Sequence, residues 1–389
     1  MLLFEPSPAL CGTRAKLYSE SVYAYYRDSE RPPMVAIRTL LEQWFAEIPA
    51  SEQLDLAQRF RSPILRQHLS ALFELYLHHL LGRSGFQVEF HPDVAGTPNH
   101  PDFLVLKDGY ARFYLEAIAV GNSTKEESEI NRINQVYDTL NALESPDFYV
   151  SVSVEGAPAS SPAGAQLRKD LKKWLATLNW EDVSASYINE EIDSIPGYEW
   201  EHDGWNVTFE PIPKPPEARG SEGVRAIGMT MDGKVRALKL DRDLKAAVCK
   251  KDRYGALTLP FVHAIQVVDR HRIDRYDVIN GLFGQATVAL GPNREQMHDR
   301  LRNGAWVAPG GSIHRTVSAV CVWSTLEPWN FVTLEPFTIH NPYATNPLQT
   351  DLIQWSQEIP DHSNNELILH PGKPIAEVLG LPIDWIPKD

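Results

Sequence analysis

Apolar residues follow a helical pattern most clearly between Ile64 and Leu81, where large hydrophobic side chains fill almost every turn. Gly82 and Gly85 come directly after this stretch, and glycines at this place are typical of a helix end. Earlier in the chain, apolar residues recur at helical spacing from Met34 to Ile48. We therefore expect residues 1–60 to form a helical N-terminal region, followed by one long helix.

Strand and helix patterns alternate after the long helix. Three strands, a helix and a fourth strand are predicted at residues 86–90, 102–106, 110–120, 125–143 and 148–154. The second and third strands are joined by Lys107-Asp108-Gly109, and an Asp-Gly pair between two alternating segments is a strong signal for a β-hairpin. The predicted order, with the long helix included, is helix, three strands, helix and strand.

The pattern is weaker in the second half of the chain. An amphipathic helix is predicted at residues 166–178, and strands are predicted at residues 205–209, 228–240, 261–268 and 317–323. We expect these four strands to extend the same sheet. The fold class is thus α/β, with a helical region at 1–60, a core at 61–180, an α/β extension at 181–345 and a surface tail at 346–389.

The composition is that of an ordinary folded protein, because 43% of the 389 residues are hydrophobic and 23% are charged. This balance excludes a wholly disordered chain. The 37 Lys and Arg residues face 51 Asp and Glu residues, which gives a formal net charge of −14. Such an acidic protein is not expected to bind nucleic acid through bulk charge alone, as histones do.

One segment reverses this balance. Residues 219–275 contain thirteen basic and seven acidic residues. Within it, Lys250, Lys251 and Arg253 stand beside Tyr254 at the end of a predicted helix, and such a group can contact phosphates. The alternative is that these lysines only interact favourably with the helix dipole. A local basic surface of this kind predicts nucleic-acid binding that is weak without metal and strongly dependent on salt.

The cysteines and the N-terminus bear on the cellular location. Cys11, Cys249 and Cys321 are far apart, which argues against a disulfide framework and against a cysteine-based zinc site. Few cysteines favour a reducing compartment, and we expect a cytoplasmic protein. The first residues lack the basic and apolar regions of a signal peptide, and no apolar run reaches 18 residues, so no membrane partner is expected.

Two carboxylates form the clearest candidate for chemistry. Asp102 begins one strand of the predicted hairpin and Glu116 lies near the end of the other, so the turn brings both to the same end of the ribbon. Two carboxylates this close raise each other's pKa unless a cation neutralises them. Mg²⁺ is bound in proteins by one or two carboxylates together with waters and substrate phosphate oxygens. The hairpin therefore predicts a site for a divalent metal ion.

The pattern Pro101-Asp102, about a dozen residues, and then Glu116-Ala117-Ile118 resembles the PD-(D/E)XK nuclease superfamily, which has the restriction-endonuclease-like fold. The resemblance covers roughly residues 60–155 and implies an αβββαβ core. It also implies that Asp102 and Glu116 hold Mg²⁺ or Mn²⁺, and that Glu74, in the preceding helix, assists them or binds a second ion. The implied activity is metal-dependent hydrolysis of phosphodiester bonds in DNA.

The chain departs from the family pattern at Ile118, where the motif has a lysine that positions or activates the attacking water. Three explanations are open. Another residue takes over this role, with Lys125 and Gln135 on the following predicted helix as the candidates. The metal alone supports slower cleavage. Or the site is inactive, and the fold binds nucleic acid or a partner protein.

Each carboxylate also has a purely structural alternative. For Glu116 the alternative is a solvent-facing position on an edge strand, and for Asp102 it is the cap of a turn after Pro101. For Glu74 the alternative is a position on the solvent-exposed face of its helix. A hydrolase that uses the histidine-rich loop at residues 91–100 is a further alternative. A homo-oligomer is compatible with every one of these interpretations.

Overall fold

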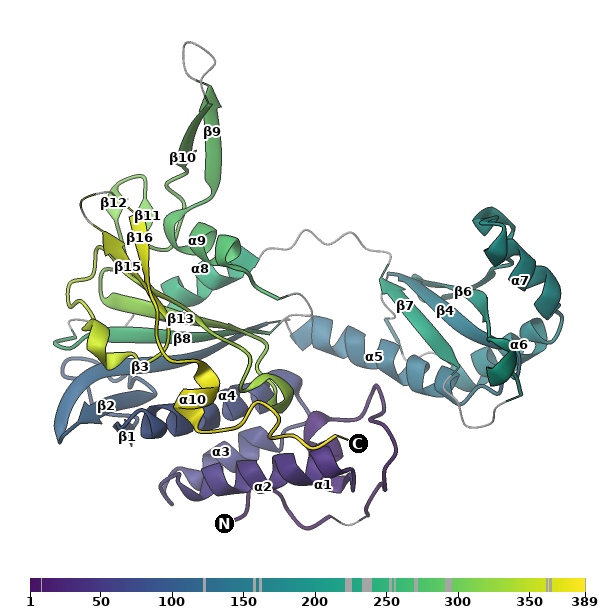
Figure 1. The fold of residues 1–389 in the computed structure, drawn as a ribbon, viewed down its shortest axis with the longest axis horizontal. Helices are drawn as coiled ribbons and strands as arrows, with labels where there is room; N and C mark the ends of the chain where they lie inside the picture. The colour runs from purple at the N-terminus through teal and green to yellow at the C-terminus, as the bar shows by residue number, and fades with distance from the viewer. Residues whose placement is uncertain are drawn as a thin grey trace. The chain divides into compact units, whose positions relative to one another are not determined.

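The computed structural model of the chain folds into two compact units (Figure 1). The first unit contains Met1–Arg14, Ser21–Asn122 and Lys239–Asp389, and the second contains Ala15–Glu20 and Ser123–Leu238. The second unit is therefore an insertion in the chain of the first. The structure describes every residue except 8, 122–123, 157–158, 161–162, 221–225, 233–239, 252–253, 255–256, 269–271, 291–295, 362, 364–365 and 389.

An eight-stranded mixed sheet forms the centre of the first unit, in the order β1-β2-β3-β8-β13-β14-β15-β16. Neighbours β1, β2 and β3 are antiparallel, whereas β3, β8 and β13 are parallel to one another. The bounds are β1 Gln87–Phe90, β2 Phe103–Lys107, β3 Tyr110–Gly121, β8 Phe261–Val268, β13 Val317–Ser324, β14 Phe337–His340, β15 Gln357–Asp361 and β16 Glu366–His370.

The hairpin between β2 and β3 has the predicted turn. Asp108 and Gly109 both have positive φ angles, 54° and 77°. Such angles suit a tight turn that matches the twist of the two strands, and aspartate and glycine tolerate them better than most residues. The hairpin is thus fixed by local sequence, and it sets the register of the two strands that carry Asp102 and Glu116.

Helices cover both faces of this sheet and bury a separate apolar cluster on each. One face packs against the N-terminal helices and α4, through side chains such as Phe113 and Leu115 of β3. The other packs against α8 and α9, through side chains such as Ile118 of β3 and Ile265 of β8. The bounds are α1 Val22–Asp28, α2 Pro32–Ala46, α3 Gln53–Phe60, α4 Leu65–Arg83, α8 Leu240–Lys251, α9 Arg275–Phe283 and α10 Ile375–Leu379.

The second unit has its own sheet and its own core. Its four strands lie in the order β5-β6-β4-β7, and Trp205 and Phe209 of β6 are fully buried. Backbone N–H groups of Tyr18 and Ser19 donate to the carboxylate of Asp138, which fastens residues 15–20 to this unit. The bounds are α5 Thr124–Asn141, β4 Phe148–Glu155, α6 Gly164–Leu175, α7 Trp180–Ile188, β5 Tyr198–His202, β6 Trp205–Pro213 and β7 Ile227–Asp232.

Smaller elements complete the description. They are the hairpins β9 Ala286–Leu290 with β10 Gln296–Arg300 and β11 Val307–Ala308 with β12 Gly311–Ser312, and the 3₁₀ turns η1 Ile192–Ser194, η2 Pro216–Ala218, η3 Pro328–Asn330 and η4 Thr350–Leu352. None of the helices in the described part of the chain combines the length and the apolar composition that a membrane crossing needs.

The predicted path of the sheet is wrong after β3. The strand at 148–154 was expected to join the first three strands, but β4 belongs to the sheet of the second unit. The parallel neighbour of β3 is β8, and the helix before it is α8. Of the four later strands, those at 261–268 and 317–323 extend the first sheet as predicted, whereas the one at 205–209 does not. The strand predicted at 228–240 is described only to residue 232, which belongs to β7 of the second sheet, and its residues 233–239 lie outside the described residues. Periodicity identifies a strand, but it carries no information about distant partners.

The domain boundaries change for the same reason. The expected core at 61–180 and the expected extension at 181–345 each contain parts of both units. The helical region at 1–60 is confirmed as helical, but its apolar side chains join the core of the first unit.

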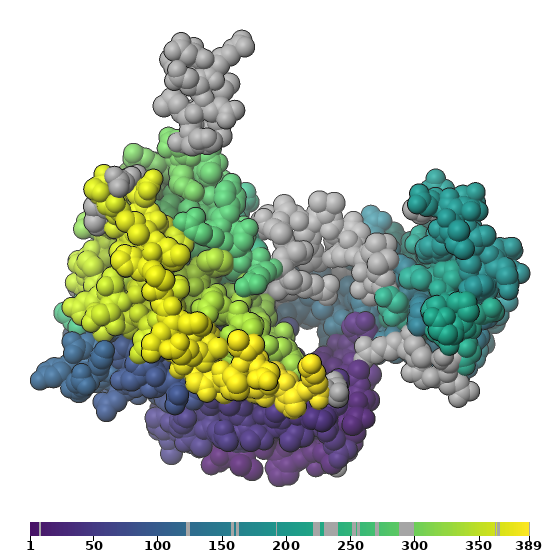
Figure 2. Space-filling view, viewed as in Figure 1, coloured from purple at the N-terminus to yellow at the C-terminus, as the bar shows by residue number. Residues whose placement is uncertain are grey.

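Residues 346–389 are not a surface tail. Figure 2 shows them spread across one side of the first unit, yet they also supply two strands of its sheet. Trp355 is 4% exposed and Ile375 is fully buried in the same apolar cluster as α4.

Replacing Trp355 tests this correction. Its ring packs near Trp323, and its Nε1–H donates to Thr338 Oγ1 at 2.8 Å. We expect Trp355→Ala to lower the free energy of unfolding by about 3–5 kcal/mol, as large buried aromatic residues do. Ile383→Ala, in the same segment but 76% exposed, should change it by less than about 0.5 kcal/mol. Urea unfolding followed by circular dichroism gives both values, and equal effects would contradict this packing.

Stability should also fall in mild acid because of His68. Burial lowers the pKa of this histidine from 6.5 to about 4, although its ring bonds the carbonyl of Phe60. Between pH 6.5 and 4 the unfolded chain takes up a proton that the folded chain does not. We expect a loss of up to about 3 kcal/mol across this window, to which other buried histidines such as His340 add. Urea unfolding at several pH values should show that His68→Gln flattens the pH dependence of the free energy of unfolding between pH 6.5 and 4.

Candidate functional site

The carboxylate of Asp102 lies against the backbone of β3, at the residue that directly follows Glu116. The register of the hairpin ends with Phe103 of β2 opposite Leu115 of β3, and one further step of this register would set Asp102 opposite Glu116. Directly opposed residues have Cβ atoms about 5 Å apart. The backbone N–H of Ala117 donates to Asp102 Oδ2 at 2.7 Å, which holds the aspartate against β3.

Glu116 is an interior residue of a central strand. β3 lies between β2 and β8, and Glu116 is only 1% exposed. Successive residues of a strand point to opposite faces, so Glu116 faces the α8 side with Ile118, while Leu115 faces α4. The alternative of a solvent-facing carboxylate on an edge strand is therefore wrong.

Tyr254 provides a contact that the sequence did not indicate. It lies between α8 and β8, is 4% exposed, and donates its hydroxyl to Glu116 Oε2 at 2.6 Å. Its ring packs edge-on against Phe261, with the centroids 5.3 Å apart. Because 138 residues separate Tyr254 from Glu116, no local pattern links them, and the aromatic residue suggested only a phosphate contact.

His263 completes this part of the sheet. The register of the parallel strands sets it beside Glu116, and it is fully buried with its ring 4.6 Å from that of Phe261. This burial makes His263 a core residue of the sheet. Glu116 is therefore enclosed by Tyr254 from the loop before β8 and by β8 itself.

The donor set suits a hard metal ion held by two protein carboxylates. Within the described part of the chain, no three His, Cys, Asp or Glu side chains converge closely enough to form a metal cluster. Mg²⁺ does not need such a cluster, since it keeps several waters and binds through one or two carboxylates. Asp102 and Glu116 thus fit Mg²⁺ or Mn²⁺, and they do not fit a metal that requires a full protein cage.

Glu74 lies elsewhere. It occupies α4, on the opposite side of the sheet from the Glu116 side chain, and the structure does not bring it to Asp102 and Glu116. Arg59 of α3 donates two hydrogen bonds to its carboxylate, at 2.6 and 2.7 Å. Burial alone would lower the pKa of Arg59, but the bonds and charge of Glu74 raise it above its usual value. Glu74 therefore joins two helices, and it is not on a wet face.

The two candidates for the missing lysine belong to the second unit. Lys125 and Gln135 lie in α5 and are exposed, and Lys125 Nζ is 3.9 Å from the carboxylate of Glu129. The helix that follows β3 within the first unit is instead α8. Ile118, at the position of the lysine, is 7% exposed and packs in the apolar cluster beneath α8.

Of the three basic residues predicted to contact phosphates, only Lys250 is fully described by the structure. Lys250 is exposed near the end of α8. Lys251 is the last residue of that helix, but its side chain lies outside the described residues, as does the whole of Arg253. The placement of Lys250 is compatible with both alternatives, a phosphate contact and an interaction with the helix dipole.

The histidine-rich loop has a structural relation to the site. His91 has a positive φ angle of 47°, and its N–H donates to the carbonyl of Asp102 at 3.0 Å. His100 Nδ1 lies 3.4 Å from the carboxylate of Asp93, which is fully exposed. The loop therefore anchors the backbone of Asp102, while the side chain of Asp102 bonds to β3.

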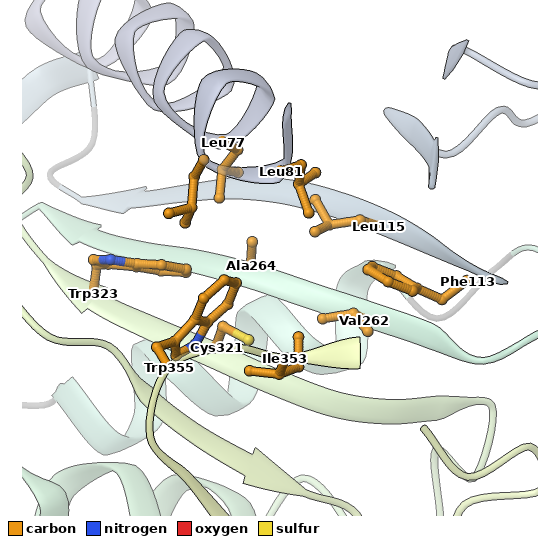
Figure 3. Close-up of a pocket in the computed structure, with 11 residues that line it drawn as sticks. Leu77, Leu81, Phe113, Leu115, Val262, Ala264, Cys321, Trp323, Ile353 and Trp355 are labelled. Carbon is orange, nitrogen blue, oxygen red and sulfur yellow. The ribbon is translucent and has the colours of Figure 1, made fainter. Parts of the chain in front are cut away.

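A small cavity lies on the other face of the sheet and is not part of this site. Figure 3 shows Leu77 and Leu81 of α4 on one side, and residues of β3, β8 and β13 on the other. Its volume is about 10 Å³, close to that of one water, and all its lining residues are apolar. Such a cavity stays dry and is too small for a substrate.

Comparisons with family models, curated proteins and solved structures find no match to this chain.

Removing the carboxylate of Glu74 tests its structural role. Glu74→Gln removes the buried charged partner of Arg59 and leaves it the exposed carboxylate of Asp55, and we expect the free energy of unfolding to fall by about 2–3 kcal/mol. Glu5→Gln breaks a similar pair with Arg61, but Glu5 is 56% exposed, so its loss should cost less than about 1 kcal/mol. Binding of Mn²⁺ should be unchanged in Glu74→Gln. A large loss of Mn²⁺ binding in Glu74→Gln would contradict this and indicate that Glu74 contributes to metal binding.

Proposed function

We propose that the first unit is a restriction-endonuclease-like core, and that it hydrolyses phosphodiester bonds of DNA with a divalent metal ion held by Asp102 and Glu116. The observation that carries this proposal is the hydrogen bond that holds the Asp102 carboxylate at the N–H of Ala117, directly after Glu116 on β3. A hairpin that places two carboxylates side by side pays an electrostatic cost that a bound cation removes.

The order of elements in the first unit supports the proposal. Along the chain, and with the inserted unit set aside, the order is α4, β1, β2, β3, α8 and β8. This is the αβββαβ order that the resemblance implies, now with α8 and β8 as its last two elements. The parallel pairing of β3 with β8 through a helical crossover is the further requirement of such a core.

The residues around the pair have separate tasks in this proposal. Asp102 is oriented by the N–H groups of Ala117 and His91, and Glu116 is oriented by the hydroxyl of Tyr254. The ion, when bound, lowers the pKa of a water and stabilises the charge that develops on the phosphate. The apolar surroundings of Glu116 strengthen its interaction with any cation that reaches it.

The charge distribution favours the first unit as the surface that meets DNA. The second unit contains twelve basic and twenty-one acidic residues, so it accounts for −9 of the total charge of −14. In the first unit, residues 239–275 contain nine basic and five acidic residues. A polyanion is therefore repelled more strongly by the insertion than by the unit that carries Asp102.

A catalytically silent protein that binds nucleic acid or a partner protein is the second candidate. Ile118 favours it, because a buried isoleucine stands where the family has its lysine, and an isoleucine cannot bind or activate a water. The two candidates share the fold and differ in turnover, so a cleavage assay separates them.

The assay incubates plasmid and single-stranded DNA with the protein in Mg²⁺ or Mn²⁺. We expect cleavage that is lost on chelation and falls by about 100-fold or more in Asp102→Ala and Glu116→Ala, since a metal ion contributes several kcal/mol to such reactions. Asp93→Ala, at a fully exposed position of the neighbouring loop, is the matched control and should cleave normally.

Two results would contradict this account in different ways. Cleavage that survives in both variants would place the active site elsewhere. No cleavage with either metal, together with binding of labelled DNA that weakens steeply as salt rises, would support the silent protein instead.

A further inference from the structure

A hydrogen bond joins β3, which carries Glu116, to the segment between α8 and β8, which carries Tyr254. The hydroxyl of Tyr254 donates to Glu116 Oε2 at 2.6 Å, and both side chains are almost completely buried. The phenol ring is held in turn by its edge-on contact with Phe261, the first residue of β8. The bond therefore connects the hairpin that carries the carboxylates to the crossover that follows the inserted unit.

We propose that Tyr254 is a positioning residue for the metal site: it fixes the orientation in which the carboxylate of Glu116 meets a divalent cation. This inference rests on the proposed function, and it names a residue that the family pattern does not contain. Tyr254 does not touch the ion in this proposal, because it acts through Glu116.

The capacity of a carboxylate explains how Tyr254 and a metal ion share Glu116. An ionised carboxylate has two oxygens and about four acceptor positions. The Tyr254 hydroxyl uses one of them, on Oε2, and Mg²⁺ or Mn²⁺ needs one. Carboxylates that bind metals are commonly held by such outer hydrogen bonds, and removal of the outer partner typically weakens metal binding by 10–100-fold.

Two other roles for Tyr254 predict different results. If its hydroxyl competes with the metal for Glu116, removing it makes metal binding tighter. If it only satisfies a buried carboxylate, removing it lowers stability and leaves metal affinity unchanged. The direction of the change in affinity therefore identifies the role.

The experiment measures Mn²⁺ binding to the full-length protein by electron paramagnetic resonance, with thermal unfolding recorded in parallel. We expect Tyr254→Phe to raise the dissociation constant by about tenfold. Tyr76→Phe is the matched control, because Tyr76 is also fully buried in the first unit but lies on α4, away from Glu116. It should leave the dissociation constant unchanged, and Glu116→Gln should abolish specific binding.

The outcomes separate this inference from the proposed function. Binding by the wild type that disappears in Glu116→Gln but is unchanged or tighter in Tyr254→Phe would overturn the role of Tyr254 and leave the metal site intact. No specific binding by the wild type would overturn both.

If Tyr254→Phe does not fold, Phe261→Leu answers the same question. It removes the ring that holds the phenol but keeps the hydroxyl. A dissociation constant raised at least threefold supports the positioning role, and an unchanged value overturns it.

Discussion

The parallel pairing of β3 with β8 is the constraint on which the first unit depends. Eight register pairs join the two strands, from Tyr114 with Phe261 to Gly121 with Val268, and the larger segment of the second unit, Ser123–Leu238, lies between them in the chain. This pairing makes β3 an interior strand. It also buries Glu116 beside His263 and brings the segment that contains Tyr254 to the carboxylate. A parallel pair needs a long crossover, and α8 together with the insertion supplies it.

The features that local sequence determines could be predicted, and those that depend on distant pairing could not. The Asp-Gly turn fixes the β2–β3 hairpin, whose register sets Phe103 opposite Leu115 and so brings Asp102 to the part of β3 that contains Glu116. By contrast, β4 has a clear strand pattern but joins another sheet, because its partners are set by side chains more than 50 residues away. The contacts of Tyr254 with Glu116 and of Arg59 with Glu74 are non-local in the same way.

Glu74 and Glu116 are both buried among apolar residues, but they have different partners in the structure. A carboxylate in an apolar environment needs compensation, but sequence does not say which kind. Glu74 is compensated by the guanidinium of Arg59 within the helical layer. Glu116 receives the hydroxyl of Tyr254 and directly precedes the residue whose N–H holds Asp102, and we propose a divalent cation as a further partner. The same reasoning from burial thus gives a structural ion pair in one case and a candidate metal ligand in the other.

Anomalous diffraction from crystals soaked in Mn²⁺ tests the central claim most directly, because it locates the ion without requiring catalysis. The account predicts one strong peak within about 2.3 Å of a carboxylate oxygen of Asp102 and of Glu116, with the Tyr254 hydroxyl still bonded to Glu116. No peak between these carboxylates in ordered crystals, or a peak only at another group of residues, would contradict it.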